Sequence, residues 1–245
     1  VAIMGMIMST SVETLPNIKE LYQWEESLSA TERSILEVSY KLYVAQQIAG
    51  TCYNASFFLC YYLKKHFDID GRVEVGFVND GLSDEYASHA WYVHKGRITD
   101  LCISRTLNAP YHHQGPLIIL GKTIIEGWNW HYYSANSPEG LAALSTLLTK
   151  SSDNPRDPIS QAKRIHIRMS NVAKSKAAMR AYLDKCLPGM TYLDRVNALR
   201  RVAIAPTPER TSPRSTPCDP LPIHAQKTAY THALSSPRYY PYTAT

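Results

Sequence analysis

The sequence predicts an α+β fold in which N-terminal helices pack on an antiparallel sheet and further helices follow. Three observations support this class. Apolar residues recur at helical spacing over residues 31–66, they alternate with other residues over 72–102, and helical spacing returns after Pro138. The chain has 245 residues, of which 44% are hydrophobic and 19% charged, and this balance is typical of a globular protein.

Two helices are expected at the start of this pattern. Over residues 31–45 the apolar residues share one helical face, and Thr31 or Ser34 is the expected N-cap. Gly50 interrupts the pattern. A second helix is expected over residues 52–66, because its apolar residues again share one face and two lysines lie in the last turn, where the helix dipole favours positive charge.

Four strands are expected after these helices. Apolar residues alternate over residues 72–78, and the segments 89–94 and 97–102 are predicted to be two strands joined by a Lys-Gly turn at positions 95–96. The short apolar run over residues 116–120 is the fourth expected strand. Helices followed by several antiparallel strands are typical of the α+β class.

The turn at positions 95–96 sets the register of the predicted hairpin. With this turn, position 91 lies opposite position 100, and His89 and Asp100 become diagonal neighbours on one face, roughly 5–8 Å apart at the backbone. A slip of one residue would place the two side chains on opposite faces of the sheet. The prediction that they meet therefore depends on the turn.

Composition divides the chain into four expected segments. These are an N-terminal extension over residues 1–30, a core over 31–135, a basic helical extension over 136–204 and a Pro-rich tail over 205–245. The tail has no amphipathic pattern and is expected to be disordered. Residues 158–202 contain ten Lys or Arg and two acidic residues, and the Pro-Gly pair at 188–189 should split them into two helices.

Three residues of the core are suited to nucleophilic chemistry. Cys52 should open a helix, where free N–H groups and the positive end of the dipole favour a thiolate and can hold an oxyanion. His89 can act as a general base, and Asp100 can hold the imidazole in the required tautomer and orientation. Gln46 is the candidate for a second oxyanion donor, Gln47 is its rival, and the sequence does not separate them.

These residues resemble the core of the transglutaminase-like cysteine superfamily. The resemblance rests on three runs in the order of that family, namely Gly50-Thr51-Cys52, Ser88-His89-Ala90-Trp91 and Gly96-Arg97-Ile98-Thr99-Asp100. It covers about residues 30–125, and nothing beyond them matches. The superfamily includes the lasso-peptide maturation proteases and is distantly related to the papain and arylamine N-acetyltransferase folds.

The resemblance implies a papain-like or transglutaminase-like core with a role for each residue. Cys52 would be the nucleophile, His89 the base and Asp100 the orienting acid. Gln46 and the backbone N–H of Cys52 would form the oxyanion hole, because the spacing between these two residues resembles that of papain-like enzymes. Trp91 is the candidate substrate-binding residue.

The expected activity is cysteine-dependent acyl transfer on a peptide, protein or small amide substrate, through a covalent acyl-enzyme and without a cofactor. Hydrolysis is favoured over transfer to an amine, because water is always present. Two other classes remain open. One is a catalytically inactive transglutaminase-like binding domain. The other is a basic interaction protein that contacts an acidic partner through the helices at 158–202.

Several features argue against other classes of protein. His112 and His113 have no carboxylate or cysteine at ligand spacing, so no metal site is expected. The aromatic cluster of Trp128, Trp130, Tyr132 and Tyr133 is expected to pack in the core, with a substrate cleft as the alternative. No apolar run is long enough to span a membrane, and the apolar N-terminal run lacks the basic residues of a secretory signal. A cytoplasmic location is therefore expected, with secretion without a cleaved signal left open.

Overall fold

The computed structural model describes residues 18–45, 50–82, 84–105, 113–152, 154 and 156–202. All of them belong to one compact unit, and they form a mixed helix-and-sheet structure, as the sequence predicts. The expected disordered tail at 205–245 and the candidate residues Gln46 and Gln47 lie outside the described residues.

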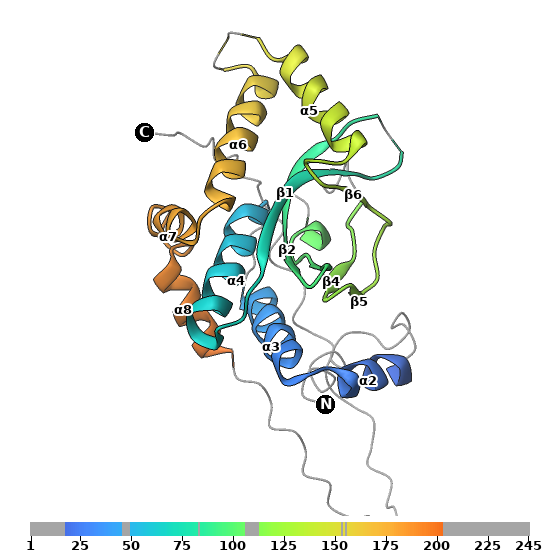
Figure 1. Ribbon diagram of the computed structural model, residues 1–245, viewed down its shortest axis with the longest axis vertical. Helices are drawn as coiled ribbons and strands as arrows, with labels where there is room; N and C mark the ends of the chain where they lie inside the picture. The colour runs from blue at the N-terminus through green and yellow to red at the C-terminus, as the bar shows by residue number, and fades with distance from the viewer. Residues whose placement is uncertain are drawn as a thin grey trace, which may run out of the picture. The chain divides into compact units, whose positions relative to one another are not determined.

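The described elements follow one another in the order shown in Figure 1. They are α2 (Ile18–Ser27), α3 (Ala30–Ala45), α4 (Cys52–Phe67), β1 (Arg72–Asn79), β2 (Ala87–His94), β3 (Arg97–Thr99), the 3₁₀ helix η2 (Ile103–Arg105), β4 (Leu117–Ile119), β5 (Lys122–Ile125), β6 (His131–Tyr133), α5 (Pro138–Lys150), α6 (Pro158–Ala173), α7 (Lys176–Asp184) and α8 (Tyr192–Arg201).

The main sheet is antiparallel and has the strand order β3-β2-β1-β6, while β4 and β5 form a separate two-stranded sheet. The turn between β2 and β3 lies at the predicted position. Lys95 and Gly96 adopt φ angles of 48° and 79°, which is the pattern of a type I′ hairpin turn. Val93 pairs with Ile98 and Tyr92 with Thr99, so the predicted register is confirmed.

Strand β3 is shorter than the sequence pattern suggests, because it ends at Thr99 rather than at residue 102. Asp100 instead forms a β-bridge to Ile118. Its Oδ1 atom accepts hydrogen bonds from the backbone N–H groups of Cys102 (2.8 Å) and Ile103 (3.3 Å). Such side-chain-to-backbone bonds turn the chain out of the strand and into η2.

Helices α3 and α4 agree with the predicted ranges to within one residue, but the expected N-cap of α3 is wrong. The cap is Ser29 rather than Thr31 or Ser34. Ser29 Oγ accepts from the backbone N–H of Glu32 (3.3 Å), and the Glu32 carboxylate accepts from the backbone N–H of Ser29 (2.8 Å). This reciprocal capping box satisfies two helix-end donors, which Thr31 and Ser34 cannot do from within the helix.

The basic segment 158–202 contains three helices rather than the two expected, because the chain also breaks between α6 and α7. Ser175 caps α7 by accepting from the backbone N–H of Ala178 (3.4 Å). The predicted break at 188–189 is present, and Gly189 has a φ of 86°, a conformation that suits glycine. Three short elements, α2, β5 and β6, were not expected from the sequence.

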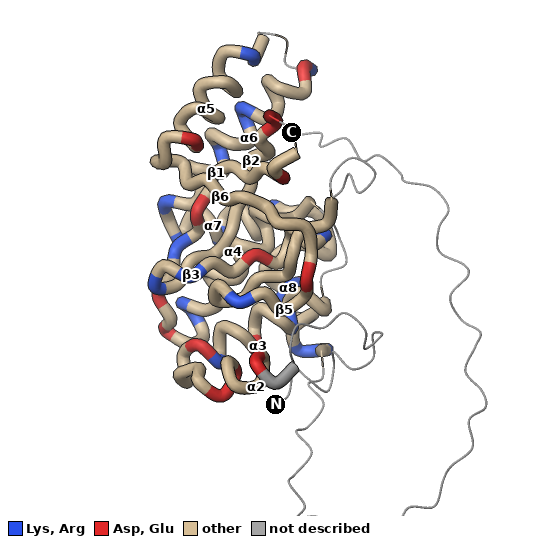
Figure 2. Tube along the Cα trace, turned by 90° about the vertical axis from the view of Figure 1, so that its right-hand side faces the viewer, with Lys and Arg blue, Asp and Glu red and all other residues tan. Residues whose placement is uncertain are grey.

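Helices α6, α7 and α8 share their hydrophobic core with the N-terminal helices. Helix α4 packs against β2 and α7, α8 packs against α3, and α6 packs against β1, as Figure 1 shows. Met179, Leu183 and Leu199 lie in the same buried cluster as Phe57 and Phe58 of α4. Residues of the expected extension therefore contribute to the same core. Figure 2 marks the Lys and Arg positions along α6, α7 and α8.

Candidate active site

Cys52 is the first residue of α4. Gly50 precedes it with a φ of 73°, and Thr51 stands at the N-cap without a side-chain capping bond. The first helical hydrogen bond joins the N–H of Ala55 to the carbonyl of Thr51 (2.9 Å). The N–H groups before Ala55 therefore have no carbonyl acceptor within the helix, and the positive end of the dipole lies at the residue Cys52.

His89 and Asp100 lie on the same face and are in direct contact. His89 Nε2 is 2.6 Å from Asp100 Oδ2, although β3 has already separated from β2 at this point. The prediction that the two side chains meet is confirmed. Asp100 is only 2% exposed, so this contact is shielded from water.

The buried Asp100 carboxylate stays charged because several donors surround it. The hydroxyl of Tyr132 in β6 donates to Oδ2 (2.8 Å), in addition to the contacts with His89 and with the backbone N–H groups of Cys102 and Ile103. Burial by itself would raise the pKa of Asp100. His89, the Cys102 N–H and the Tyr132 hydroxyl more than offset this effect, and they lower the pKa below its ordinary value.

The Cys52 side chain interacts with the His89 imidazole and raises its pKa. Since Asp100 occupies Nε2, the remaining ring nitrogen for Cys52 is Nδ1. Burial lowers the pKa of His89, but the Asp100 carboxylate and the Cys52 sulfur raise it more strongly, to about 10. The imidazole therefore holds its proton well above neutral pH.

Trp91 lies next to this group but has little surface for a substrate. The residue is 3% exposed and packs in a second hydrophobic cluster with Val78, Val93 and Trp130. It also stacks near the His89 ring (centroids 6.2 Å apart) and meets Tyr132 edge to face (5.1 Å). In this arrangement Trp91 packs against His89 and against Tyr132, whose hydroxyl bonds to Asp100. Its expected role in substrate binding stays a prediction.

A second chain of hydrogen bonds runs beside the candidate site. The Tyr53 hydroxyl is 2.7 Å from Ser88 Oγ, and Ser88 Oγ is 2.6 Å from His166 Nδ1 on α6. His166 also stacks on Phe77, with ring centroids 4.6 Å apart, and burial lowers its pKa. Tyr53 follows the candidate nucleophile and Ser88 precedes the candidate base. The chain therefore ties the start of α4 to β2 and α6.

Sequence reasoning missed Tyr132, Ser88 and His166. Tyr132 belongs to the aromatic cluster that was expected in the core, and the alternating pattern of β6 is only three residues long, too short to predict a strand. Of the rest of that cluster, Trp130 is buried and Trp128 is exposed, with its indole N–H bonded to the Asp80 carbonyl (2.6 Å).

The described residues contain no cluster of three or more His, Cys, Asp or Glu that could hold a metal ion. His113 instead stacks on Trp128, with ring centroids 4.6 Å apart, while His112 is not among the described residues. Among the helices of the described part of the chain, none combines the length and apolar character needed to cross a membrane.

Comparison of the chain with protein-family models, with curated proteins and with solved structures finds no significant match. The resemblance to the transglutaminase-like superfamily therefore stays a prediction from the three short runs of sequence and the order in which they occur.

Proposed function

We propose that the protein is a cysteine-dependent acyl-transfer enzyme with a papain-like or transglutaminase-like core. The observation that supports this proposal is the grouping of Cys52, the first residue of α4, with the His89–Asp100 pair. A cysteine used only for packing needs neither an imidazole partner nor a buried carboxylate behind that imidazole.

In the proposed reaction the Cys52 thiolate attacks the carbonyl carbon of an amide. The oxyanion that forms is held by the backbone N–H of Cys52 and, if the resemblance to papain-like enzymes holds, by Gln46. Protonated His89 then gives its proton to the leaving amine, the carbon–nitrogen bond breaks, and an acyl-enzyme remains on the sulfur.

The acyl-enzyme is resolved by an incoming nucleophile. Neutral His89 takes a proton from water as the water attacks the thioester. The carboxylic acid product leaves, and the Cys52 thiolate and the His89 imidazolium are regenerated. An amine can enter in the same way and give a new amide. Hydrolysis is the proposed outcome in the absence of an amine. Asp100 keeps Nδ1 directed at the sulfur by holding Nε2.

Alkylation with iodoacetamide near pH 6 tests the proposed nucleophile. An ordinary thiol is almost entirely protonated at this pH and therefore reacts slowly. Its rate then depends mainly on how exposed it is to the reagent. Among the described cysteines, Cys186 is more exposed than Cys52, Cys60 and Cys102. We expect Cys52 nevertheless to react at least about tenfold faster than Cys186, because the imidazolium of His89 favours its thiolate. Peptide mass spectrometry of a time course measures the rate at each cysteine.

The matched variant is His89→Gln, which keeps a polar side chain and removes the cation. In this variant the rate at Cys52 should fall to or below that of Cys186, while the rate at Cys186 should not change. If Cys52 of the unmodified protein reacts no faster than Cys186, the proposal fails, and the inactive binding domain becomes the better interpretation.

A further inference from the structure

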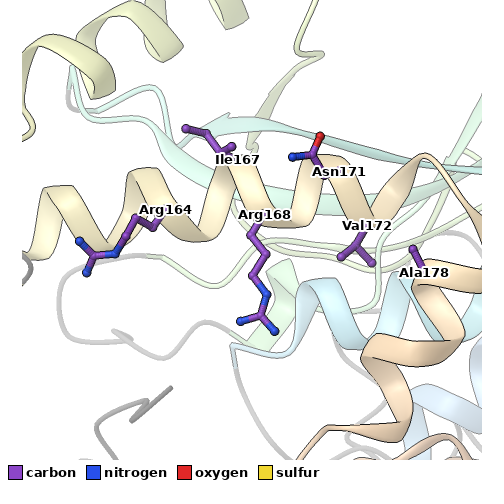
Figure 3. A pocket seen from close by; sticks show the side chains of 6 residues that line it. All are labelled: Arg164, Ile167, Arg168, Asn171, Val172 and Ala178. Carbon is purple, nitrogen blue, oxygen red and sulfur yellow. The ribbon is translucent and has the colours of Figure 1, made fainter. Parts of the chain in front are cut away.

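Helix α7 begins just after the chain leaves α6. Figure 3 shows Val172 near the end of α6 and Ala178 at the start of α7, and both line a surface pocket of about 540 Å³. Lys176, the first residue of α7, is half-buried, and its side chain reaches Cys60 of α4. The start of α7 therefore brings an amine to the middle of the helix that begins at Cys52.

The amine of Lys176 lies very close to a buried thiol. Its Nζ atom is 2.8 Å from Cys60 Sγ and donates to the Gly71 carbonyl at 2.8 Å, and the Cys60 thiol donates to the same carbonyl at 3.3 Å. An N–H···O bond has a length of about 2.9 Å, and sulfur is a larger atom than oxygen. The nitrogen is therefore closer to the sulfur than an ordinary hydrogen bond would place it, at a separation that one bridging oxygen atom can span.

No ion pair accounts for the position of Lys176. Within the described part of the chain, the neighbouring carboxylates pair with other residues, Asp70 with Lys64 (3.0 Å) and Asp184 with Arg180 (2.7 Å). A half-buried lysine normally directs its charge to a carboxylate or to water. The pairing of this amine with a thiol is therefore a feature of the site itself and not a consequence of a salt bridge.

A buried hydroxyl beside this pair lacks a hydrogen-bond partner. Tyr92 of β2 is 0% exposed, and its hydroxyl has no partner among the described residues. This hydroxyl lies beside Gly71, because a Cβ atom added to the glycine would be 2.3 Å from the Tyr92 oxygen. Unpaired buried hydroxyls are costly. An oxygen atom added to this group of side chains would offer Tyr92 an acceptor.

We propose that Cys60 and Lys176 form an oxidation-dependent cross-link in which one oxygen atom joins the sulfur to the nitrogen. The link ties α4 to α7 across a separation of 116 residues. It closes a long loop and therefore restricts the unfolded chain, as a disulfide does. The proposal does not depend on the proposed function, because Cys52 contributes no atom to the link.

Hydrogen peroxide is the oxidant, and two molecules of it are consumed. The first oxidises the thiol: its O–O bond breaks, an S–O bond forms, Cys60 becomes a sulfenic acid and one water leaves. The N–O bond then forms as one N–H bond of the neutral Lys176 amine and the O–H bond of the sulfenic acid break. The second peroxide takes up these two protons and two electrons and becomes two waters. Excess dithiothreitol reduces the link back to thiol, amine and water.

The environment of Cys60 sets the conditions for this reaction. Burial raises the pKa of the Cys60 thiol, and the hydrogen bond and charge of Lys176 offset only part of this effect. The thiolate, which is the form that reacts with peroxide, is therefore scarce at neutral pH. A slightly alkaline pH increases its share, and peroxide is small enough to enter when the structure opens locally.

Peptide mass spectrometry after peroxide treatment tests the link. The full-length protein is incubated with hydrogen peroxide at about pH 8.5, and catalase then removes the excess. The remaining thiols are alkylated during denaturation, and the protein is digested. We expect a peptide pair that joins Cys60 to Lys176 and is about 14 Da heavier than the sum of the two peptides, since one oxygen is gained and two hydrogens are lost. Dithiothreitol added before alkylation should remove nearly all of this pair.

Three variants show which atoms form the link. Cys60→Ser removes the sulfur, Lys176→Arg keeps the positive charge and removes the amine, and neither should give the linked pair. Lys174→Arg makes the same change at an exposed lysine that donates to Asn171 (2.9 Å), and it should give as much linked pair as the unmodified protein. Cys52→Ala should also give the linked pair.

Urea unfolding provides a second measurement. In the unmodified protein and in Lys174→Arg, peroxide should shift the unfolding midpoint to higher urea, and dithiothreitol should reverse the shift. In Lys176→Arg peroxide should cause no upward shift, because the link cannot form. An equal upward shift in Lys176→Arg would contradict the proposal.

The proposal fails if Cys60 keeps a free thiol at a peroxide dose that oxidises the more exposed Cys186. It also fails if Cys60 carries added oxygen atoms without a link to Lys176. A linked pair about 2 Da lighter than the sum of its peptides would contain a direct sulfur–nitrogen bond and would overturn the oxygen bridge. Links from Cys60 to other lysines in Lys176→Arg would show that the contact is not specific, which overturns the proposal as well.

Discussion

Asp100 uses both oxygens of its carboxylate to hold the candidate site. Oδ2 contacts His89 Nε2 and accepts from Tyr132, and Oδ1 accepts from the backbone N–H groups of Cys102 and Ile103. The backbone bonds orient the carboxylate, and the charge that remains on it keeps His89 protonated. One residue therefore ends a strand, orients the imidazole and raises its pKa.

This arrangement predicts how pH affects stability through His89. The folded state raises the pKa of His89 from its ordinary 6.5 to about 10, so the folded protein holds this proton more tightly than the unfolded chain does. The contribution of His89 to the free energy of unfolding is complete below about pH 6.5 and is lost as the pH rises towards 10.

The measurement is best made in a Cys52→Ala background, because this removes the titration of the partner thiol. We expect the free energy of urea unfolding to fall above pH 6.5 more steeply in Cys52→Ala than in Cys52→Ala/His89→Gln, and the fall should end below pH 10, because the contribution of the Cys52 sulfur to the pKa of His89 is absent. The other titrating groups are common to both variants and cancel in the difference. Equal slopes in the two variants would contradict a raised pKa for His89.

At the scale of secondary-structure elements, Gly76 shows why β1, β2 and β6 can come together at the site. Gly76 pairs with His89 in the sheet register. A Cβ atom on Gly76 would lie 2.3 Å from the backbone carbonyl of Tyr133 and 2.8 Å from the ring of Trp91. The missing side chain therefore lets β6 approach β1 and lets Trp91 pack beneath the strand.

Gly76→Ala is expected to destabilise the protein by about 1–3 kcal/mol, the usual cost of inserting a methyl group into a packed region. It should also slow the labelling of Cys52, since the added Cβ displaces Trp91 and β6, and β6 carries Tyr132. Urea unfolding and iodoacetamide labelling measure the two effects.

Gly96→Ala is the matched control for Gly76→Ala. A Cβ on Gly96 meets no atom within 4 Å, although its φ of 79° is costly for any other residue. This variant should lose stability, by about 1–2 kcal/mol, and keep the labelling rate of Cys52. If Cys52 of Gly76→Ala is labelled as fast as in the unmodified protein, the packing of β6 does not affect the reactivity of the sulfur.

At the scale of the whole molecule, the basic helices complete the core of the described unit. Met179 and Leu183 of α7 and Leu199 of α8 are buried against the N-terminal helices. Phe57 of α4 meets Tyr182 of α7 edge to face, with ring centroids 5.3 Å apart. The segment therefore has two roles: its apolar residues complete the core on the inner side of the helices, and its charged residues form the surface on the outer side.

Two truncations test whether the C-terminal helices are part of the core or an attached extension. Removal of residues 205–245 takes away none of the described core and should change the melting temperature by no more than a few degrees. Removal of residues 174–245 exposes the apolar side of α4 and should abolish cooperative unfolding, because large buried side chains contribute about 2–5 kcal/mol each. Calorimetry or circular dichroism measures both. A cooperative transition in the shorter protein would show that residues 174–204 are not part of the core.

The sequence by itself determined the helices at 31–45 and 52–66, the hairpin turn at 95–96 and, through its register, the contact of His89 with Asp100. These features follow from periodicity and turn chemistry, which act between residues close together in the chain. The capping of α3, the length of β3 and the short elements β5 and β6 depend on particular side-chain bonds or on pairing, and their local patterns are too short to predict them.

Only the tertiary structure decided which distant segments join this pair. The interaction of Cys52 with His89, the bond from Tyr132 to Asp100 and the bond from Arg195 to Asn54 all link residues far apart in sequence. Such contacts arise when apolar faces of helices and strands pack against one another. The pattern within each segment does not show which other segment it will pack against. The periodicity of the chain thus predicts the elements, while packing between them assembles the site.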